Sequence, residues 1–211
     1  MSYIDEAVYS SKIILGENVR IEPGVYIGHR EDGADSNTEP VVIGDNSIIR
    51  TGAIIYEGVR IGCNTHIGHN CVIRYCARLG DNSVLSHNVV IEHHGIIGNW
   101  VRISPHTHIT SNVVIEDRVF IGAGVVTIND KYLVWKNKDF SPDLTPQYIE
   151  YGSRIGSGST LLPGIRVGRQ SIVGAASLVT KDVPSNVTVY GHPAKVIGDA
   201  VRECSTPNGL D

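Results

Sequence analysis

The sequence predicts an all-β fold: a parallel β-helix of about eight triangular coils with two loop insertions and a short C-terminal tail. Aliphatic residues stand six residues apart from Ile43 to Ile121, and a small or β-branched residue follows each of them four residues later. Both spacings are even, so they match the two-residue period of a strand and not the 3.6-residue turn of a helix. A fixed repeat of this length is typical of stacked short strands, three of which close one coil.

Each hexad is expected to contribute an inward aliphatic side chain, a turn with Gly, Asn or Asp, and a small residue at the corner. Successive coils should stack at the inter-strand spacing of about 4.8 Å. The register begins at Leu15 and predicts a single domain over residues 1–199, with a frayed polar tail over 200–211. Residues 1–11 show no clear repeat and are expected to cap the core.

Two insertions interrupt the repeat, at residues 29–40 and 130–148. The first is polar and charged, and it is either a solvated loop or a wall for a ligand. The second carries Tyr132, Trp135 and Phe140 in a chain with only 6% aromatic residues. A long aromatic insertion inside a compact repeat is usually functional, and the alternative is a contact between copies of the chain.

Length and composition favour one soluble, compact domain. The chain has 211 residues, 41% of them hydrophobic, and a net charge of -4, and no basic patch suggests a nucleic acid partner. No apolar run is long enough for a membrane span, and no secretion leader is recognisable, so neither is expected. The cysteines at 63, 71, 76 and 204 lack a paired CxxC spacing, which favours a reduced, cytoplasmic protein.

The chemistry is expected at one corner of the coil, because residues eighteen apart lie above one another. One column contains Tyr75, His93, Ser111 and Asn129, and the neighbouring column contains Cys76, His94, Asn112 and Asp130. Both lie at the corner from which the second insertion departs. A histidine pair, two amides, a carboxylate and aromatic residues therefore converge there, which predicts a site.

A zinc site is not expected. The γ-class carbonic anhydrases share this kind of repeat and use two histidine ligands five residues apart, but the residue five before His93 is Asn88. His87 is off by one, which turns its side chain to the other face of the strand. No other His/Cys cluster has zinc spacing, so we predict no metal.

Several local segments together resemble the hexapeptide-repeat acyltransferases with a left-handed β-helix, most closely the bacterial nucleotide-amino-sugar N-acetyltransferases. IEHHGIIG at 91–98 looks like their segment that carries a catalytic histidine. INDKY at 128–132, followed by the insertion, is similar to the enzymes that modify 3-amino sugars. VTKDVP at 179–184 and GHPAK at 191–195 resemble the terminal coil and coenzyme-binding tail.

The resemblance implies a cytoplasmic homotrimer with sites between subunits, acetyl-CoA as co-substrate, a nucleotide-linked amino sugar as acceptor, and no nucleic acid, membrane or metal. His93 would be the general base, since histidine titrates near neutrality. The substrate would be held by His94, Asn112, Asn129, Asp130, Lys131, Tyr132 and Trp135. The coenzyme would contact Gly122, Ala123, Ser157, Gly158, Ala175, Ala176, Lys181 and Lys195, with a backbone N–H near Gly122 or Ala123 stabilising the oxyanion.

Other functions stay open at this point. In one alternative the acceptor amine attacks without help from His93. In others the acceptor is a hydroxyl, as in sugar O-acetyltransferases and serine acetyltransferases, or the chain is a β-helix scaffold without catalysis. The scaffold explains the convergent columns poorly.

Overall fold

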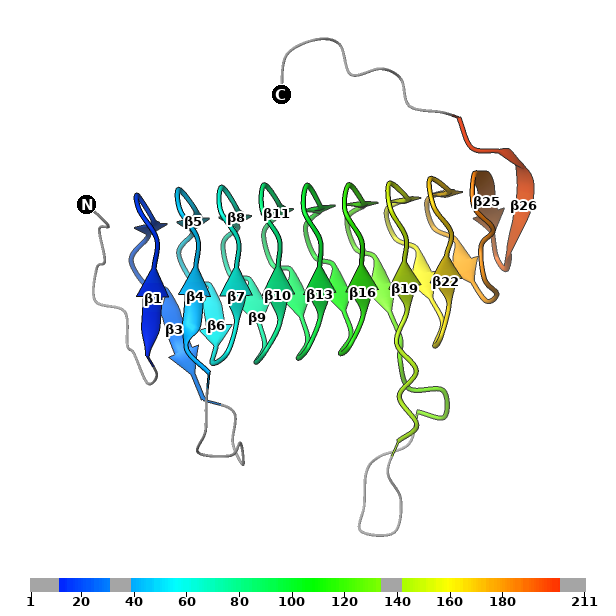
Figure 1. Ribbon diagram of the computed structural model, residues 1–211. Helices are drawn as coiled ribbons and strands as arrows, with labels where there is room; N and C mark the ends of the chain where they lie inside the picture. The colour runs from blue at the N-terminus through cyan, green and yellow to red at the C-terminus, as the bar shows by residue number, and fades with distance from the viewer. Residues whose placement is uncertain (1–11, 31–38, 134–141, 202–211) are drawn as a thin grey trace.

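The computed structural model describes residues 12–30, 39–133 and 142–201, which form a triangular β-helix of parallel strands (Figure 1). Three sheets run along the prism, and we name them sheets A, B and C. Within the described ranges there is no helix capable of spanning a membrane. The expectations for residues 1–11 and for residues 202–211 of the tail lie outside the described residues.

The bounds of the strands follow, sheet by sheet. Sheet A contains β2 (Arg20–Ile21), β5 (Ile48–Ile49), β8 (His66–Ile67), β11 (Val84–Leu85), β14 (Arg102–Ile103), β17 (Phe120–Ile121), β20 (Arg154–Ile155), β23 (Ile172–Val173), β25 (Val187–Gly191) and β26 (Ala194–Asp199). Sheet B contains β3 (Tyr26–His29), β6 (Ile54–Tyr56), β9 (Val72–Ile73), β12 (Val90–Ile91), β15 (His108–Ile109), β18 (Val126–Thr127), β21 (Thr160–Leu161) and β24 (Leu178–Val179). Sheet C contains β1 (Ile13–Leu15), β4 (Val41–Ile43), β7 (Arg60–Ile61), β10 (Arg78–Leu79), β13 (Ile96–Ile97), β16 (Val114–Ile115), β19 (Tyr148–Ile149) and β22 (Arg166–Val167).

The chain passes from sheet C to sheet A to sheet B and then starts the next coil in sheet C. Three edges result. The BC edge follows each sheet B strand and includes residues 74–77, 92–95 and 110–113. The AB edge follows each sheet A strand and includes residues 86–89, 104–107 and 122–125. The CA edge follows each sheet C strand and includes residues 98–101 and 116–119.

The predicted hexad register is observed throughout. The inward aliphatics pair directly from coil to coil, as Ile91 does with Ile73 and Ile109, and all three are fully buried. The small residues four positions on, such as Val89, are buried too. The core is therefore one continuous column of aliphatic side chains, in which each coil buries the apolar surface of the next.

The edges turn through left-handed backbone conformations. Asn46, Asn64, Asn82 and Asn88 all have φ between 53° and 57°, and asparagine tolerates this region better than most residues. Histidine and cysteine take the same conformation on the BC edge, where φ is 56° at His94 and 58° at Cys76. His106 on the AB edge and Trp100 on the CA edge have the same conformation, so it is a property of the turn and does not mark a site.

Both insertions leave the prism from the BC edge, the first between β3 and β4 and the second between β18 and β19 (Figure 1). The column that contains His93 therefore lies between the two insertions. At the C-terminal end, β25 pairs parallel with β23, and β26 turns back to pair antiparallel with β25. Regular structure thus extends to Asp199, the end of β26.

Candidate functional site

The BC edge stacks the predicted columns as the eighteen-residue spacing requires. The ring of His93 lies parallel to that of Tyr75, with centroids 4.9 Å apart and an interplanar angle of 2°. His94 packs edge-on against both rings, at 5.2 Å from Tyr75 and 5.6 Å from His93. The backbone N–H of Asn112 donates to the carbonyl of His93 at 3.0 Å, so the next coil fixes the height of the histidine.

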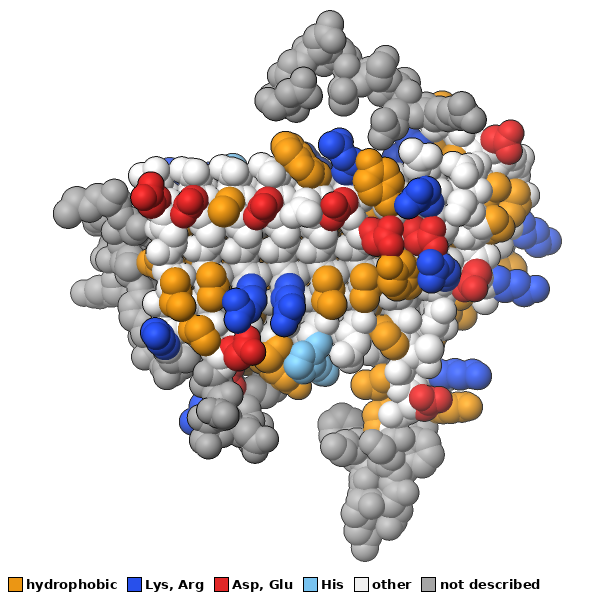
Figure 2. Space-filling view, in the orientation of Figure 1, with side chains coloured by type: hydrophobic (Ala, Val, Ile, Leu, Met, Phe, Trp, Pro, Cys, Tyr) orange, Lys and Arg blue, Asp and Glu red, His pale blue; other side chains and the backbone are white. Residues whose placement is uncertain are grey.

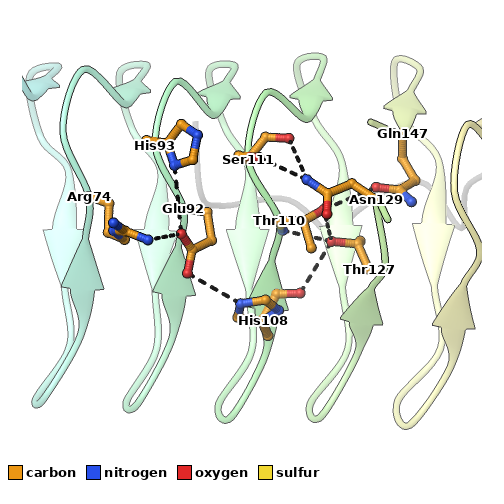
Figure 3. A network of polar contacts seen from close by, with 9 residues as sticks. All are labelled: Arg74, Glu92, His93, His108, Thr110, Ser111, Thr127, Asn129 and Gln147. Carbon is orange, nitrogen blue, oxygen red and sulfur yellow. Dashed lines mark hydrogen bonds and ion pairs between the residues drawn. The ribbon is translucent and has the colours of Figure 1, made fainter. Parts of the chain in front are cut away.

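Glu92 is the centre of the charged part of this site (Figure 3). Its Oε2 accepts a hydrogen bond from Arg74 Nη1 at 2.6 Å and lies 3.8 Å from His93 Nδ1. Its Oε1 lies 3.6 Å from His108 Nε2. One carboxylate therefore faces one guanidinium and two imidazoles, brought together from three successive coils.

The surroundings of Glu92 keep its side chain ionised. The His108 imidazole holds the pKa of Glu92 below its ordinary value, and Arg74 adds to the effect, whereas partial burial opposes it. An anion at this place favours a proton on a neighbouring imidazole. Glu92 Oε2 is beyond hydrogen-bond distance of His93 Nδ1, so the carboxylate faces this ring as a nearby negative charge, and Nε2 is directed away from Glu92 (Figure 3).

A second polar group lies further along the same edge (Figure 3). Asn129 Nδ2 donates to the hydroxyl of Ser111 at 2.8 Å. The backbone N–H of Thr110 donates to Thr127 Oγ1 at 2.8 Å, and the two threonine hydroxyls lie 2.9 Å apart. Gln147 accepts from Thr110 Oγ1 at 3.3 Å and donates to the carbonyl of Leu162 at 2.8 Å.

Thr127 and Gln147 anchor the two ends of the second insertion. Both are 1% exposed and occupy inward positions that other coils give to aliphatic residues. Their polar atoms are hydrogen-bonded to Thr110 and to the carbonyl of Leu162, so these polar side chains can remain in the core. Sequence reasoning missed Gln147, and also Glu92, Arg74 and His108. Two signals were available: Thr127 breaks the aliphatic row, and Arg74 and Glu92 stand eighteen residues apart.

The start of the second insertion is held by Asp130, whose Oδ1 accepts the backbone N–H groups of Tyr132 and Leu133, both at 2.9 Å. Lys131 Nζ lies 5.7 Å from the centroid of the Tyr132 ring, and Tyr132 is 58% exposed. A groove of about 420 Å³ lies between this segment and the next coil, lined by Asp130, Lys131, Leu133, Thr145, Leu162 and Thr180. Trp135 lies outside the described residues.

The small residues expected at the coenzyme lie on another edge. Gly122, Ala123, Ser157, Gly158, Ala175 and Ala176 are all on the AB edge, a full side of the coil away from His93. The N–H of Gly122 donates to the carbonyl of Ile155 at 2.8 Å, as part of the regular ladder. That of Ala123 donates to the Ser157 hydroxyl at 3.1 Å, which can rotate away. A single chain does not bring these residues to His93.

Lys181 and Lys195 do come together. They line a groove of about 310 Å³ at the C-terminal end of the prism, whose other walls include Val179, Val189 and Pro193. Lys181 belongs to the BC edge, and Lys195 is brought to it by β26. No group of three or more His, Cys, Asp or Glu side chains that could hold a metal occurs among the residues that the structure describes.

Two families of known sequences match the chain. The GMPPB C-terminal domain matches residues 37–140, and the hexapeptide repeat of succinyl-transferase matches residues 146–181. Together they cover the repeat on both sides of the second insertion.

Curated relatives resemble parts of the chain. A galactoside O-acetyltransferase from Lactococcus lactis is 33% identical over 99 residues, which are 43% of this chain and 48% of that protein. A serine acetyltransferase from Buchnera aphidicola is 38% identical over 105 residues, 46% of this chain and 38% of that protein. A 2,3,4,5-tetrahydropyridine-2,6-dicarboxylate N-acetyltransferase from Staphylococcus aureus is 46% identical over 59 residues, 28% of this chain and 25% of that protein. The chain spans about half or less of the length of these relatives.

Solved structures share the fold. A UDP-N-acetylglucosamine acyltransferase from Bacteroides fragilis has a TM-score of 0.73 at 22% identity, covering 92% of this chain and 72% of that one. The same kind of enzyme from Campylobacter jejuni has a TM-score of 0.65 at 16% identity, covering 92% and 73%. These likenesses confirm the predicted left-handed parallel β-helix.

Proposed function

Because this chain belongs to the hexapeptide-repeat acyltransferase family, we propose that it is an acyl-CoA-dependent N-acyltransferase. The acyl group is acetyl, and the acceptor is the amino group of a nucleotide-linked amino sugar. The observation that carries the proposal is the pair of Glu92 and His93 on the BC edge, between the two insertions. The acetyltransferase names of the curated relatives support the acetyl donor.

In the proposed mechanism, His93 acts as the general base. Glu92 faces Nδ1, so Nε2 takes the proton from the acceptor amine while the nitrogen attacks the thioester carbonyl. A C–N bond forms, the C–S bond then breaks, and the thiolate of coenzyme A leaves. The ionised Glu92 stabilises the imidazolium that results. Asn129 and Asn112, further along the same edge, would hold hydroxyls of the sugar.

We further propose that the active unit is a homotrimer with sheet B around the threefold axis. The outward strand positions of sheet B carry no Lys, Arg, Asp or Glu among the described residues, and they include Tyr26, Ile54, Val72, Val90 and Val126, together with His108, which lies toward Glu92. Sheets A and C carry arginines at the equivalent positions, such as Arg102 and Arg78. An uncharged face is the one that a second subunit covers at the lowest desolvation cost.

This arrangement would join the two halves of the site. With sheet B inside, the BC edge of one subunit adjoins the AB edge of the next, so His93 meets Ala123 and Ser157 of its neighbour. The Ala123 N–H would then stabilise the oxyanion once the Ser157 hydroxyl turns away. The small side chains at 158, 175 and 176 would admit coenzyme A, and Lys181 and Lys195 would meet its phosphates. The free thiols of Cys63, Cys71 and Cys76 accord with a cytoplasmic location.

A second candidate is an O-acetyltransferase, which the galactoside and serine acetyltransferase relatives favour. A hydroxyl is a weaker nucleophile than a neutral amine, so this reaction depends more strongly on a base. The same dyad of Glu92 and His93 would serve it.

The test is thiol release from acetyl-CoA with a panel of nucleotide-linked 3-amino and 4-amino sugars and of hydroxyl acceptors. We expect turnover of an amino sugar by the wild type. We expect His93→Ala to lower kcat by about 100-fold or more, the usual contribution of a general base, and His66→Ala, on the outward face of β8, to have no effect. Retained activity in His93→Ala would show that the amine attacks unaided. Failure of acetyl-CoA to bind or turn over with any acceptor would refute the acetyl-donor proposal.

A further inference from the structure

Two arginines lie side by side on the outer face of sheet C. Arg60 on β7 and Arg78 on β10 are direct partners in the parallel pairing, and both are exposed. Figure 2 shows the two basic side chains on neighbouring coils, beside one acidic side chain. Like charges directly opposite each other on neighbouring strands destabilise a sheet, so a reason for this pair must lie outside the strands themselves.

Only one of the two charges is balanced. Arg60 Nη2 lies 3.1 Å from Glu39 Oε2, in the segment that returns from the first insertion. Arg78 forms no ion pair within residues 12–30, 39–133 and 142–201. Arg20 and Arg166 are exposed and paired with Glu22 and Glu150, whereas Arg118, which is exposed like Arg78 and lies on another edge, forms no ion pair within the described residues either. Arg78 therefore presents a net positive charge on this face.

That charge lies close to the candidate active site. Arg78 is paired with Ile96, which follows His93 by three residues, so the Cα atoms of Arg78 and His93 are about 10 Å apart by strand geometry. The positive charge of Arg78 acts electrostatically on Cys76, which lies on the BC edge. Burial raises the pKa of the Cys76 thiol, Glu39 and Glu57 raise it further, and Arg78 acts in the opposite direction.

We infer that Arg78, together with Arg60, binds the diphosphate of the nucleotide-linked acceptor. A guanidinium presents a planar pair of N–H donors that matches two phosphate oxygens, and a bound dianion removes the repulsion between the two arginines. The inference rests on the proposed function for its choice of acceptor. The separation of Arg78 from His93 leaves room for one sugar ring between the reacting amine and the diphosphate.

The inference also fixes the direction in which the acceptor lies. In sheet C, Arg78 and Arg60 lie one and two strands before that of Ile96, the strand that follows His93, so the nucleoside extends toward the first insertion. Tyr132 is on the opposite side, at the second insertion. The stacking on a nucleobase expected for Tyr132 from the sequence would then not occur.

The experiment is calorimetric titration of the full chain with inorganic pyrophosphate and with UDP. We expect Arg78→Gln to weaken both at least tenfold and Arg60→Gln to weaken both to a smaller extent, because Glu39 already shares its charge. Arg78→Lys should bind with intermediate affinity, since lysine keeps the positive charge but lacks the planar pair of N–H donors. The matched control is Arg118→Gln, an exposed arginine on the CA edge, which should bind like the wild type, as should Tyr132→Ala.

Equal affinities of Arg78→Gln and Arg118→Gln would overturn the inference, as would weaker UDP binding in Tyr132→Ala than in Arg78→Gln. A lipid-linked diphosphate has the same anionic group, so geranyl diphosphate is titrated in parallel. Binding as tight as that of UDP would refute the nucleoside part. The proposed function is tested separately by thiol release with a free amino sugar, which needs no diphosphate.

Discussion

Glu92 is a single side chain that bonds to one guanidinium and lies near two imidazoles. Its carboxylate bonds to Arg74 at 2.6 Å and lies 3.8 Å from His93 Nδ1 and 3.6 Å from His108 Nε2. The negative charge is balanced by the guanidinium of Arg74 or by a proton on a neighbouring imidazole. If Glu92 acts through His93, its role is to position and stabilise the base and not to hold the substrate. This role can be distinguished from a merely structural one by kinetics.

We predict that Glu92→Gln lowers kcat by about tenfold and leaves KM for the acceptor unchanged. Loss of the anion makes protonated His93 less stable, so the acid limb of the rate profile should move to lower pH. The measurement is the pH dependence of kcat in steady-state assays. A rise in KM with the wild-type profile retained would contradict the assignment.

The same residue should affect folding stability in acid. The folded-state pKa of Glu92 is lowered from 4.5, so its stabilising contribution is present above that value and is lost as the pH falls through the folded pKa. Between about pH 5 and pH 3, the free energy of unfolding should therefore fall less in Glu92→Gln than in the wild type. Urea denaturation across this range measures the difference. If the free energy of unfolding fell equally with pH in both proteins, the predicted contribution of Glu92 would be wrong.

Cys71 is predicted to be unreactive in the folded protein. Burial raises the pKa of its thiol to about 11, its side chain is fully buried, and its Sγ donates to the carbonyl of Ser86 at 2.9 Å. Because the thiolate is the reactive form, a thiol reagent at neutral pH should modify Cys71 only after unfolding. Mass spectrometry of labelled peptides, with Cys63 as the partly exposed comparison, provides the test.

At the scale of the element, the repeat depends on the close approach of successive coils at the edges. At Gly98 an added Cβ would lie 2.7 Å from the backbone nitrogen of Asp117, whereas at Gly124 nothing lies within 4 Å. Gly124 has φ of +66°, so only backbone strain opposes a side chain there. The two glycines therefore separate steric clash from strain.

We predict that Gly98→Ala destabilises the protein by more than about 2 kcal/mol, because the backbone of the next coil must move. Gly124→Ala should cost about 1 kcal/mol, the usual penalty for a left-handed non-glycine residue. Chemical denaturation of both variants gives the comparison. If Gly124→Ala proved the more destabilising of the two, backbone strain and not the close approach of successive coils would decide the cost of a side chain at these edges.

The second insertion shows how an element is fastened to the repeat. Thr127 and Gln147 replace core aliphatics, and their side chains close a hydrogen-bond network with Thr110 and the carbonyl of Leu162. These two polar side chains lie at the points where the chain leaves and rejoins the prism, whereas small buried hydroxyls such as those of Ser47 and Ser83 occur in other coils too. It also adjoins Asn129, so the base of the insertion and the candidate site share one rigid support (Figure 3).

For the whole molecule, the distribution of charge over the three faces predicts the assembly. We expect sedimentation to give a trimer, and we expect Val126→Asp, on the outward face of sheet B, to shift it toward monomer. A buried, unpaired carboxylate at such an interface is strongly unfavourable. Val114→Asp, on sheet C, is the matched control and should remain trimeric. A trimer that survived Val126→Asp and dissociated with Val114→Asp would place the axis at another face.

The repeat and its columns could be predicted from the sequence, because parallel stacking fixes which residues lie eighteen apart in register. Tyr75 does lie against His93, and Asn129 does bond to Ser111. Arg74 and Glu92 are also eighteen apart, so the same rule pairs them. The approach of Glu92 to His93 and His108 could not be found in this way, because it depends on side-chain conformations where the BC edge adjoins sheet B, and these are not periodic.

The sequence by itself determined the fold class, the register, the two insertions and the position of His93 between them, since each follows from an even spacing or its interruption. Only the tertiary structure decided that both insertions leave from one edge, that Glu92 links two histidines to an arginine, and that the AB and BC edges are a full coil side apart. The physical reason is that a repeat specifies neighbours along the axis of the prism. Relations around the axis depend on how three strands close into a triangle and on which side chains then face each other.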